Sequence, residues 1–193
     1  MTKGFEDDFA TIGMLVESKT RTGRTDAFIV AYAKQEKQVR RIFTYMIYQY
    51  PVFNLGNFKE IVDCVVSKRY LDFDNFIKGF DALYPKSFET VVGSALYTSF
   101  VNVDFPRIKD FRNKIIHGQP TGQSLDLDDL KHEIEIIKNW CLQVAETMKT
   151  EICFDGFEWN SFKKCTEKDL VLTYKVTIST TQELDNFVEA NMK

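Results

Sequence analysis

The sequence predicts a mainly α-helical protein, and three observations support this prediction. Apolar residues recur every three or four positions over two long segments, near residues 27–49 and 127–151. Residues that favour helix N-termini precede most of the apolar runs, and proline follows several of them. No apolar run approaches the roughly 20 residues that a membrane-spanning helix needs. We therefore expect a helical bundle over residues 1–152, a smaller C-terminal appendage over 153–193, and no membrane partner.

Two helices joined by a turn are expected at the N-terminus. Residues 5–18 carry apolar side chains at helical spacing, and the stretch TRTGRT at 20–25 indicates a turn. Thr25 or Asp26 is the expected cap of a long helix over residues 27–49. The aromatic residues near the end of that helix fit a buried stripe better than a surface on which RNA bases stack.

Shorter helices are expected in the aromatic-rich middle of the chain, which we interpret as an insertion between the two long helices. Their predicted bounds are 57–70, 73–83 and 87–100, and their predicted caps are Asn57, Asp72 and Ser87. Asp72, Asp74 and Asp81 could be imagined as metal ligands. Capped helix starts explain them better, so we predict no metal site.

A short helix is expected next, in the run FPRIKDFRNKIIH. Asp104 could cap this helix, Pro106 suits its first position, and Gly118 is placed to close it in a left-handed conformation. Its buried stripe is predicted to be Ile108, Phe111 and Ile115. The helix should therefore end at His117.

The polar side of this short helix carries Arg112, Asn113 and His117. Asn113 and His117 are four residues apart and point the same way, while the long side chain of Arg112 can curl back toward the imidazole. His132 is the other of the two histidines in the chain, and we interpret it as a surface residue rather than a catalytic partner.

These three residue types suit RNA cleavage without a metal. Such a site must deprotonate a 2′-hydroxyl, protonate the leaving oxygen and stabilise negative charge on phosphorus. Histidine titrates at roughly pH 6.5 and suits the proton transfers. Arginine binds two phosphate oxygens with a planar fork and never loses its charge. Asn113 can hold the imidazole or the phosphate by neutral hydrogen bonds.

The run from Arg112 to Gly118, RNKIIHG, resembles the R-N-x-x-x-H motif of the HEPN superfamily, small helical domains found in many RNA-cutting toxins and antiviral effectors. The resemblance implies a HEPN-like bundle and a homodimer in which both motif helices face one cleft. It also implies metal-independent endoribonuclease activity that leaves a 2′,3′-cyclic phosphate, with Arg112, Asn113 and His117 as catalytic residues. RNA, an antitoxin or another regulatory protein would be the partners, and no cofactor is implied.

Two features limit what the resemblance implies. Several HEPN branches have a tyrosine just after the histidine, whereas Gln119 and Pro120 follow Gly118 here, which argues against the branch controlled through that tyrosine. A simpler alternative also remains: Arg112 could pair with the acidic helix downstream while His117 only caps a helix end. The domain would then be a non-catalytic module that binds a protein, a nucleotide or RNA.

The negative net charge implies that any RNA-binding surface is confined to a local cluster of basic residues. The net charge is −3, unlike that of a protein that binds polyanions over its whole surface. Basic residues cluster at 34–41 and around the motif, although either cluster can be an ordinary solvated face. The candidate RNA-binding residues are Lys34, Arg40, Arg41, Lys109 and Lys114.

The cysteines and the N-terminus predict a cytoplasmic protein. The four cysteines are scattered and form no C-x-x-C pair, which favours reduced thiols over disulfides or a zinc site. The first residues lack the charged and apolar blocks of a signal peptide.

The last third of the sequence changes character at Cys153. Before it, a long helix over residues 127–151 has a stripe formed by Leu127, Leu130, Ile134, Ile137, Cys141, Val144 and Met148. After it, residues 154–162 and 170–179 are rich in β-branched and aromatic side chains, which predicts a β-hairpin. Two strands alone are marginal, so this hairpin should pack on the bundle or pair with another chain. A last helix should open at Thr181.

Overall fold

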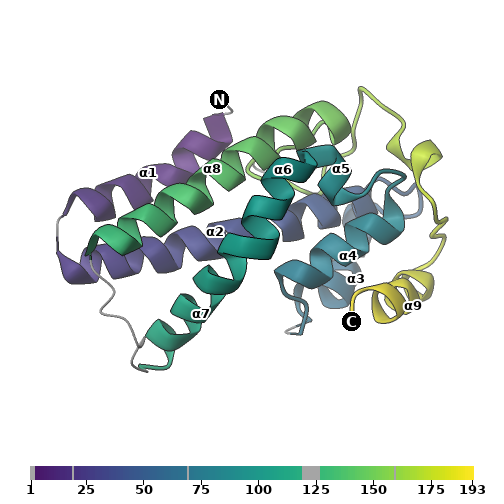
Figure 1. The fold of residues 1–193 in the computed structure, drawn as a ribbon. Coiled ribbons are helices and arrows are strands. Elements are labelled where there is room, and N and C mark those ends of the chain that lie inside the picture. The colour runs from purple at the N-terminus through teal and green to yellow at the C-terminus, as the bar shows by residue number, and fades with distance from the viewer. Residues whose placement is uncertain (1–2, 19, 69, 119–126, 159) are drawn as a thin grey trace.

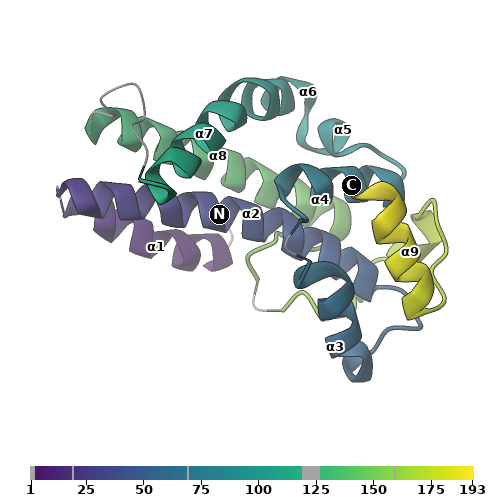
Figure 2. The same cartoon turned by 90° about the horizontal axis from the view of Figure 1, so that it is seen from below.

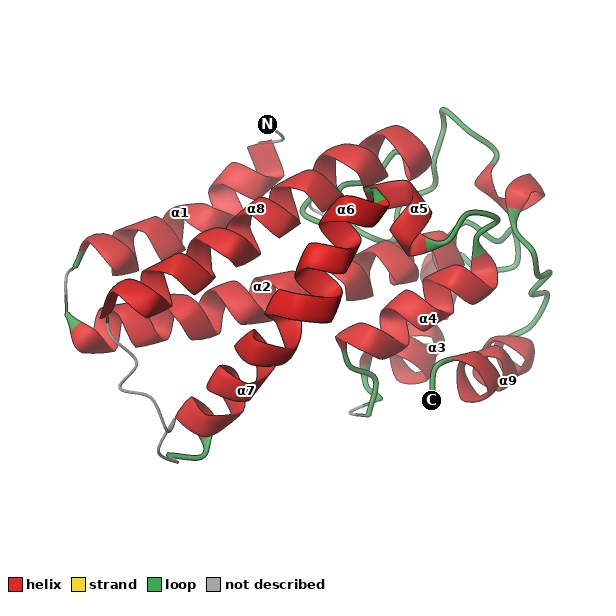
Figure 3. Cartoon of the chain, viewed as in Figure 1, coloured by secondary structure: helices red, strands yellow, loops and turns green. Residues whose placement is uncertain are grey.

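Every regular element that the structure describes is a helix (Figure 3). The structure is a computed structural model that describes residues 3–18, 20–68, 70–118, 127–158 and 160–193. Three long helices, α1 (Lys3–Glu17), α2 (Arg21–Tyr48) and α8 (Leu127–Ile152), lie side by side and run along much of the molecule (Figure 1). The prediction of a mainly helical protein is confirmed.

The junction between α1 and α2 is shorter than predicted. Residues 21–25 form the first turn of α2, so the predicted turn at 20–25 is wrong. Thr20 caps the helix instead of Thr25 or Asp26, because its Oγ1 accepts a hydrogen bond from the Gly23 N–H at 2.9 Å. A Cβ at Gly23 would collide with Ser18 Oγ, so glycine permits the close approach of the two helices.

The middle of the chain forms short helical pieces. They are η1 (Leu55–Asn57), α3 (Phe58–Ile61), the π-helix η2 (Val62–Val66), α4 (Phe73–Leu83), α5 (Phe88–Val92) and α6 (Ser94–Tyr97). The predicted caps Asp72 and Ser87 are confirmed, but Asn57 makes no capping hydrogen bond, and Asn54 caps η1 instead. Gly93 separates α5 from α6 because its φ of +94° suits glycine alone.

The motif helix continues from a second π-helix. The segment η3 (Thr98–Asp104) runs directly into α7 (Phe105–Ile116). Asp104 is therefore not at a free helix start, and the predicted capping bond is absent: its carboxylate accepts a hydrogen bond from Arg107 Nη2 at 2.9 Å instead. In Figure 1, α7 runs obliquely away from the three long helices toward one edge of the molecule.

One continuous core joins these helices. The predicted stripe of α8 is buried at each of its described side chains from Leu130 to Met148. Ile108 and Phe111 of α7 are also buried, while Ile115 is partly buried. Trp140 of α8 is fully buried at the centre and stacks on Phe100, with ring centroids 4.3 Å apart.

The predicted β-hairpin is wrong. The described residues between α8 and α9 (Thr181–Asn191) follow an irregular path, with one 3-10 turn, η4 (Leu170–Thr173), and no strand. No partner strand binds the backbone of this segment among the described residues. Two glutamine side chains, one in α2 and one at its C-terminal cap, form hydrogen bonds with it instead. Gln38 Nε2 donates to the Asp155 carbonyl at 3.1 Å, and Gln49 Nε2 donates to the Lys163 carbonyl at 3.0 Å.

The C-terminal segment shares the core of the bundle. Phe154 stacks on Tyr45 at 4.5 Å, and Phe187 of α9 stacks on Phe43 at 6.4 Å. Figure 2 shows α9 beside α3 and α4, and contacts join it to α4 and η2. The last helix is confirmed, and the division at residue 152 stays a prediction. None of the described helices is both long enough and apolar enough to cross a membrane.

Candidate functional site

The three motif residues lie at the C-terminal end of α7, Arg112 and Asn113 inside the helix and His117 directly after it. The helix ends at Ile116, His117 is its C-terminal cap, and Gly118 has a φ of +62°. The His117 N–H donates to the Asn113 carbonyl at 3.0 Å, which keeps the cap against the final turn. The predicted left-handed glycine is confirmed, and the helix ends one residue before the predicted His117.

Arg112 lies between its neighbour Asn113 and helix α2. Its Nη1 donates to Asn113 Oδ1 at 2.9 Å, and its guanidinium carbon lies 5.4 Å from the centre of the Tyr32 ring. This contact with Tyr32 is a cation–π interaction. The sequence did not single out Tyr32, because 80 positions separate it from Arg112 and nothing local links the two.

Tyr32 is suited to hold the guanidinium in place. Burial, the neighbouring Glu36 carboxylate and a hydrogen bond to it raise the pKa of the Tyr32 phenol far above its usual value. The ring therefore stays neutral across the physiological range. It also packs parallel to Phe105 at the start of α7, with centroids 6.1 Å apart, so α2 contacts the motif helix at both ends.

The ion pairs to α8 come from other arginines than Arg112. Arg107 Nε and Nη2 donate to the two oxygens of the buried Glu133 carboxylate at 2.8 and 3.0 Å. Arg24 of α2 lies 3.5 Å from Asp128. Among the described contacts, these two arginines pair with the acidic helix, whereas Arg112 contacts Asn113 and Tyr32.

His117 is open to solvent at the end of α7. Its neighbour Ile116 is 49% exposed, which is high for an isoleucine at a helix end. His132, the other histidine, is exposed on α8. One chain therefore presents one exposed histidine, one arginine five positions before it and an exposed isoleucine at the end of α7.

The candidate RNA-binding lysines have carboxylate partners. Lys34 pairs with Asp8, and Lys114 pairs with Asp110 at 2.6 Å. Lys109 lies 3.0 Å from Asp72 and 3.6 Å from Asp74. These ion pairs tie the lysines to their own chain, and their contacts with RNA stay a prediction.

The candidate arginines of α2 bind backbone carbonyls instead. Arg40 Nη2 lies 3.5 Å from the Leu71 carbonyl oxygen, and Arg41 Nη2 donates to the Glu158 carbonyl. Both guanidinium groups also cover aromatic rings, Arg40 that of Phe76 at 5.4 Å and Arg41 that of Phe154 at 5.6 Å. Among the described contacts, neither guanidinium forms an ion pair with a carboxylate, although Asp8, Asp155 and Glu158 lie near enough to Arg41 to act on its charge.

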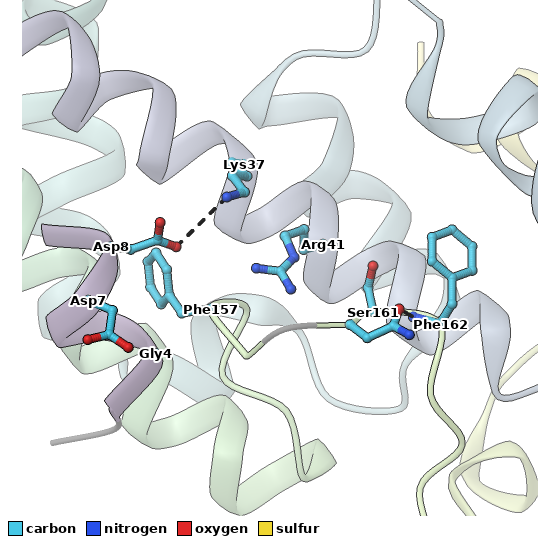
Figure 4. Close-up of a pocket in the computed structure, with 9 residues that line it drawn as sticks. Gly4, Asp7, Asp8, Lys37, Arg41, Phe157, Ser161 and Phe162 are labelled. Atoms are coloured by element: carbon cyan, nitrogen blue, oxygen red, sulfur yellow. Dashed lines mark hydrogen bonds and ion pairs between the residues drawn. The ribbon is translucent and has the colours of Figure 1, made fainter.

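Arg41 and Lys37 line a depression between α1 and the C-terminal segment (Figure 4). In this view Lys37 reaches toward Asp8, 3.8 Å away, and Arg41 lies between Phe157 and Ser161. Asp8 already pairs with Lys34 through its other oxygen. Among the residues that the structure describes, no group of three or more histidine, cysteine, aspartate or glutamate side chains could hold a metal ion.

Comparison with known proteins gives no match: no protein-family model, no curated protein and no solved structure is significantly similar to the chain.

Proposed function

We propose that the protein is a metal-independent endoribonuclease of the HEPN type, acting in the cytoplasm as a homodimer. Arg112, Asn113 and His117 would be its catalytic residues, and an antitoxin or another regulatory protein would hold its activity in check. The observation that carries the proposal is the arrangement at the end of α7: Arg112 bound to Asn113, held over Tyr32, with His117 exposed one turn later.

Cleavage would require two copies of this arrangement. His117 of one protomer takes the proton of the 2′-hydroxyl, the 2′-oxygen attacks the adjacent phosphorus, and the bond to the 5′-oxygen breaks. The partner's His117 gives a proton to that leaving oxygen. The products are a 2′,3′-cyclic phosphate and a 5′-hydroxyl. Each Arg112 stabilises the charge that builds on the phosphate oxygens.

Pre-positioning of Arg112 supports this mechanism. An arginine on a flexible helix end would lose conformational entropy when it binds phosphate. Here one face of the guanidinium lies over Tyr32 and Nη1 is bound to Asn113, so less freedom remains to be lost. Asn113 would thus act mainly by holding Arg112, which adds to the roles expected from the sequence.

The direct test is incubation of the purified protein with total RNA in EDTA, followed by analysis of the product ends. Cleavage with cyclic phosphate ends is expected. His117→Ala should reduce the rate by about a hundredfold to ten-thousandfold, because a positioned acid or base contributes that much.

His132→Ala is the matched control, since this exposed histidine lies on α8 and should be dispensable. Cleavage that requires a divalent metal, or equal activity of His117→Ala and wild type, would contradict the proposal. A binding module would then be the better description.

A further inference from the structure

A second hollow on α2 combines positive charge with exposed aromatic surface. It has a volume of about 580 Å³ and lies between α2, the π-helix η2 and the C-terminal segment. We call it the α2–η2 groove. The side chains that matter here are those of Glu36, Lys37, Arg40, Arg41, Phe58 and Phe162.

Its polar wall has three cations and one carboxylate, in a chain whose net charge is negative. Among the described contacts, Arg40 and Arg41 donate hydrogen bonds to the backbone carbonyls of Leu71 and Glu158. The Arg40 Nε is buried and has no hydrogen-bond partner among the described residues. Lys37 is about half exposed, and its contact with Asp8 is longer than a hydrogen bond.

The lowered pKa of the Lys37 ammonium group indicates that the groove favours a bound anion. Burial lowers the pKa of the Lys37 ammonium, Asp8 partly offsets this, and the neighbouring charges of Lys34 and Arg41 lower the pKa further. A bound anion would act in the opposite direction and stabilise all these charges at once.

The opposite wall is apolar and aromatic. Phe58 is 48% exposed, and its ring lies 4.5 Å from that of Phe162 at an angle of 55°. The ring of the buried Tyr48 packs against Phe162, with ring centroids 5.5 Å apart. The core therefore supports the Phe58–Phe162 pair. Val62 and Val66 extend this wall along η2, and such π-helical turns are frequent at functional sites.

We propose that the α2–η2 groove binds one nucleotide unit of single-stranded RNA, with its phosphate at Lys37, Arg40 and Arg41 and its base against Phe58. Single-strand binding proteins combine these two features, a cationic track and an aromatic stacking surface. A duplex would not fit, because its bases are already stacked and its phosphates lie outside. The substrate part of this inference rests on the proposed ribonuclease function.

The groove is also within reach of the motif. Tyr32, which Arg112 covers, and Arg40 of the groove are eight residues apart on α2, which corresponds to about 12 Å along the helix axis and about 80° around it. Glu36, which lines the groove, interacts with Tyr32 and lies between the two sites. A strand cleaved at α7 could therefore continue into the groove, which would then contribute to affinity and not to the chemical step.

The test is a fluorescence-anisotropy titration with a labelled 2′-O-methyl decaribonucleotide, which lacks the 2′-hydroxyl needed for cleavage. Phe58→Ala should raise Kd about tenfold, as expected for one lost stacking contact. Lys37→Ala should raise Kd and reduce the slope of log K against log salt by about 0.7, the value for one single-strand phosphate contact.

Matched controls separate the groove from the general surface. Tyr70→Ala removes an aromatic ring of equal exposure, 47%, and Lys131→Ala removes an exposed lysine of α8; both lie outside the groove. These variants should bind as wild type. Equal losses in the controls, or equally tight binding of the corresponding duplex, would overturn the inference. If the variants bind RNA as expected but the protein cleaves no RNA, the proposed ribonuclease function is contradicted and the inference about the groove stands.

Discussion

At the scale of single residues, Arg112 matters through its geometry as much as through its charge. Its planar group donates to Asn113 and covers Tyr32, and neither contact can be reproduced by an ammonium group in the same way. Arg112→Lys should therefore reduce cleavage about a hundredfold to a thousandfold, as loss of an oxyanion-stabilising donor does. Lys114→Arg, a change of similar size at a variable position of the motif that keeps the charge, should retain activity when RNA cleavage is measured in EDTA.

Asn113 should contribute less than Arg112. Its side-chain oxygen accepts one hydrogen bond from the arginine, and such a bond to a charged group contributes about 1.5 to 3 kcal/mol. Asn113→Ala should accordingly slow cleavage about tenfold to a hundredfold. Asn113→Asp should be less impaired than Asn113→Ala if holding Arg112 is the role of this residue, and single-turnover rates would distinguish the two.

Cys165 should be the most reactive of the four thiols. Burial alone would raise the pKa of Cys165, but hydrogen bonds from the backbone of Glu167 and Lys168 outweigh burial and lower it. Burial raises the pKa of Cys64 and Cys141, and that of Cys153 to about 11. A lower pKa gives more thiolate at a given pH. At pH 7.5, brief iodoacetamide labelling and peptide mass analysis should find Cys165 modified first; preferential labelling of Cys153 would contradict this order.

The motif residues could be predicted from the sequence because they lie close together along the chain. Arg112, Asn113 and His117 lie within six positions, and Pro106 and Gly118 bound their helix. Tyr32, Phe58 and Phe162 could not be found in this way. They join the two candidate sites only after folding brings α2, α3 and the C-terminal segment together.

At the scale of elements, the C-terminal segment shows what the sequence could not decide. Its β-branched and aromatic residues suit strands, yet α2 supplies buried glutamines that satisfy its backbone groups. Gln38 and Gln49 lie on the helix that the sequence predicted well, but their partners lie more than 100 residues away. Local propensity therefore predicted the wrong element, whereas the cap-and-stripe patterns of α4 and α8 led to the right ones.

Gln49 should stabilise the C-terminal segment measurably. Its Nε2 donates to the Lys163 carbonyl at 3.0 Å, and its Oε1 accepts from the Cys165 N–H at 2.7 Å. Gln49→Met would leave both backbone groups unpaired, so the free energy of unfolding in urea should fall by about 1 to 3 kcal/mol.

Gln182→Met is the control for this change. Gln182 is exposed on α9 and binds only Asn186 nearby, at 3.1 Å, among the described contacts. Its substitution should alter the free energy of unfolding by less than about 0.5 kcal/mol. Equal effects of the two substitutions would show that the backbone contacts of Gln49 contribute nothing.

At the scale of the whole molecule, the proposed mechanism needs a second protomer, because each chain has one set of motif residues. Light scattering at micromolar concentration should give about twice the chain mass of 22.5 kDa. Ile116, exposed beside His117, should lie at the two-fold interface, so Ile116→Asp should yield monomers that do not cleave RNA yet melt at the same temperature.

Leu172 provides the matched control for the dimer. It is 83% exposed on η4, in a different part of the chain, and Leu172→Asp should leave both the mass and the activity unchanged. A strictly monomeric wild-type protein that still cleaves RNA would contradict the shared site.

The π-helix η3 sets the direction, around the axis of α7, in which the motif side chains point. Because η3 runs into α7 without a break, the number of residues after Gly93 sets the direction in which each side chain of α7 points. Insertion of one residue into α6, with the geometry of η3 unchanged, would turn α7 by about 100° relative to α2. Ile108 would leave the core and Arg112 would turn away from Tyr32. The length of this stretch, independent of its composition, therefore determines whether the motif faces its support.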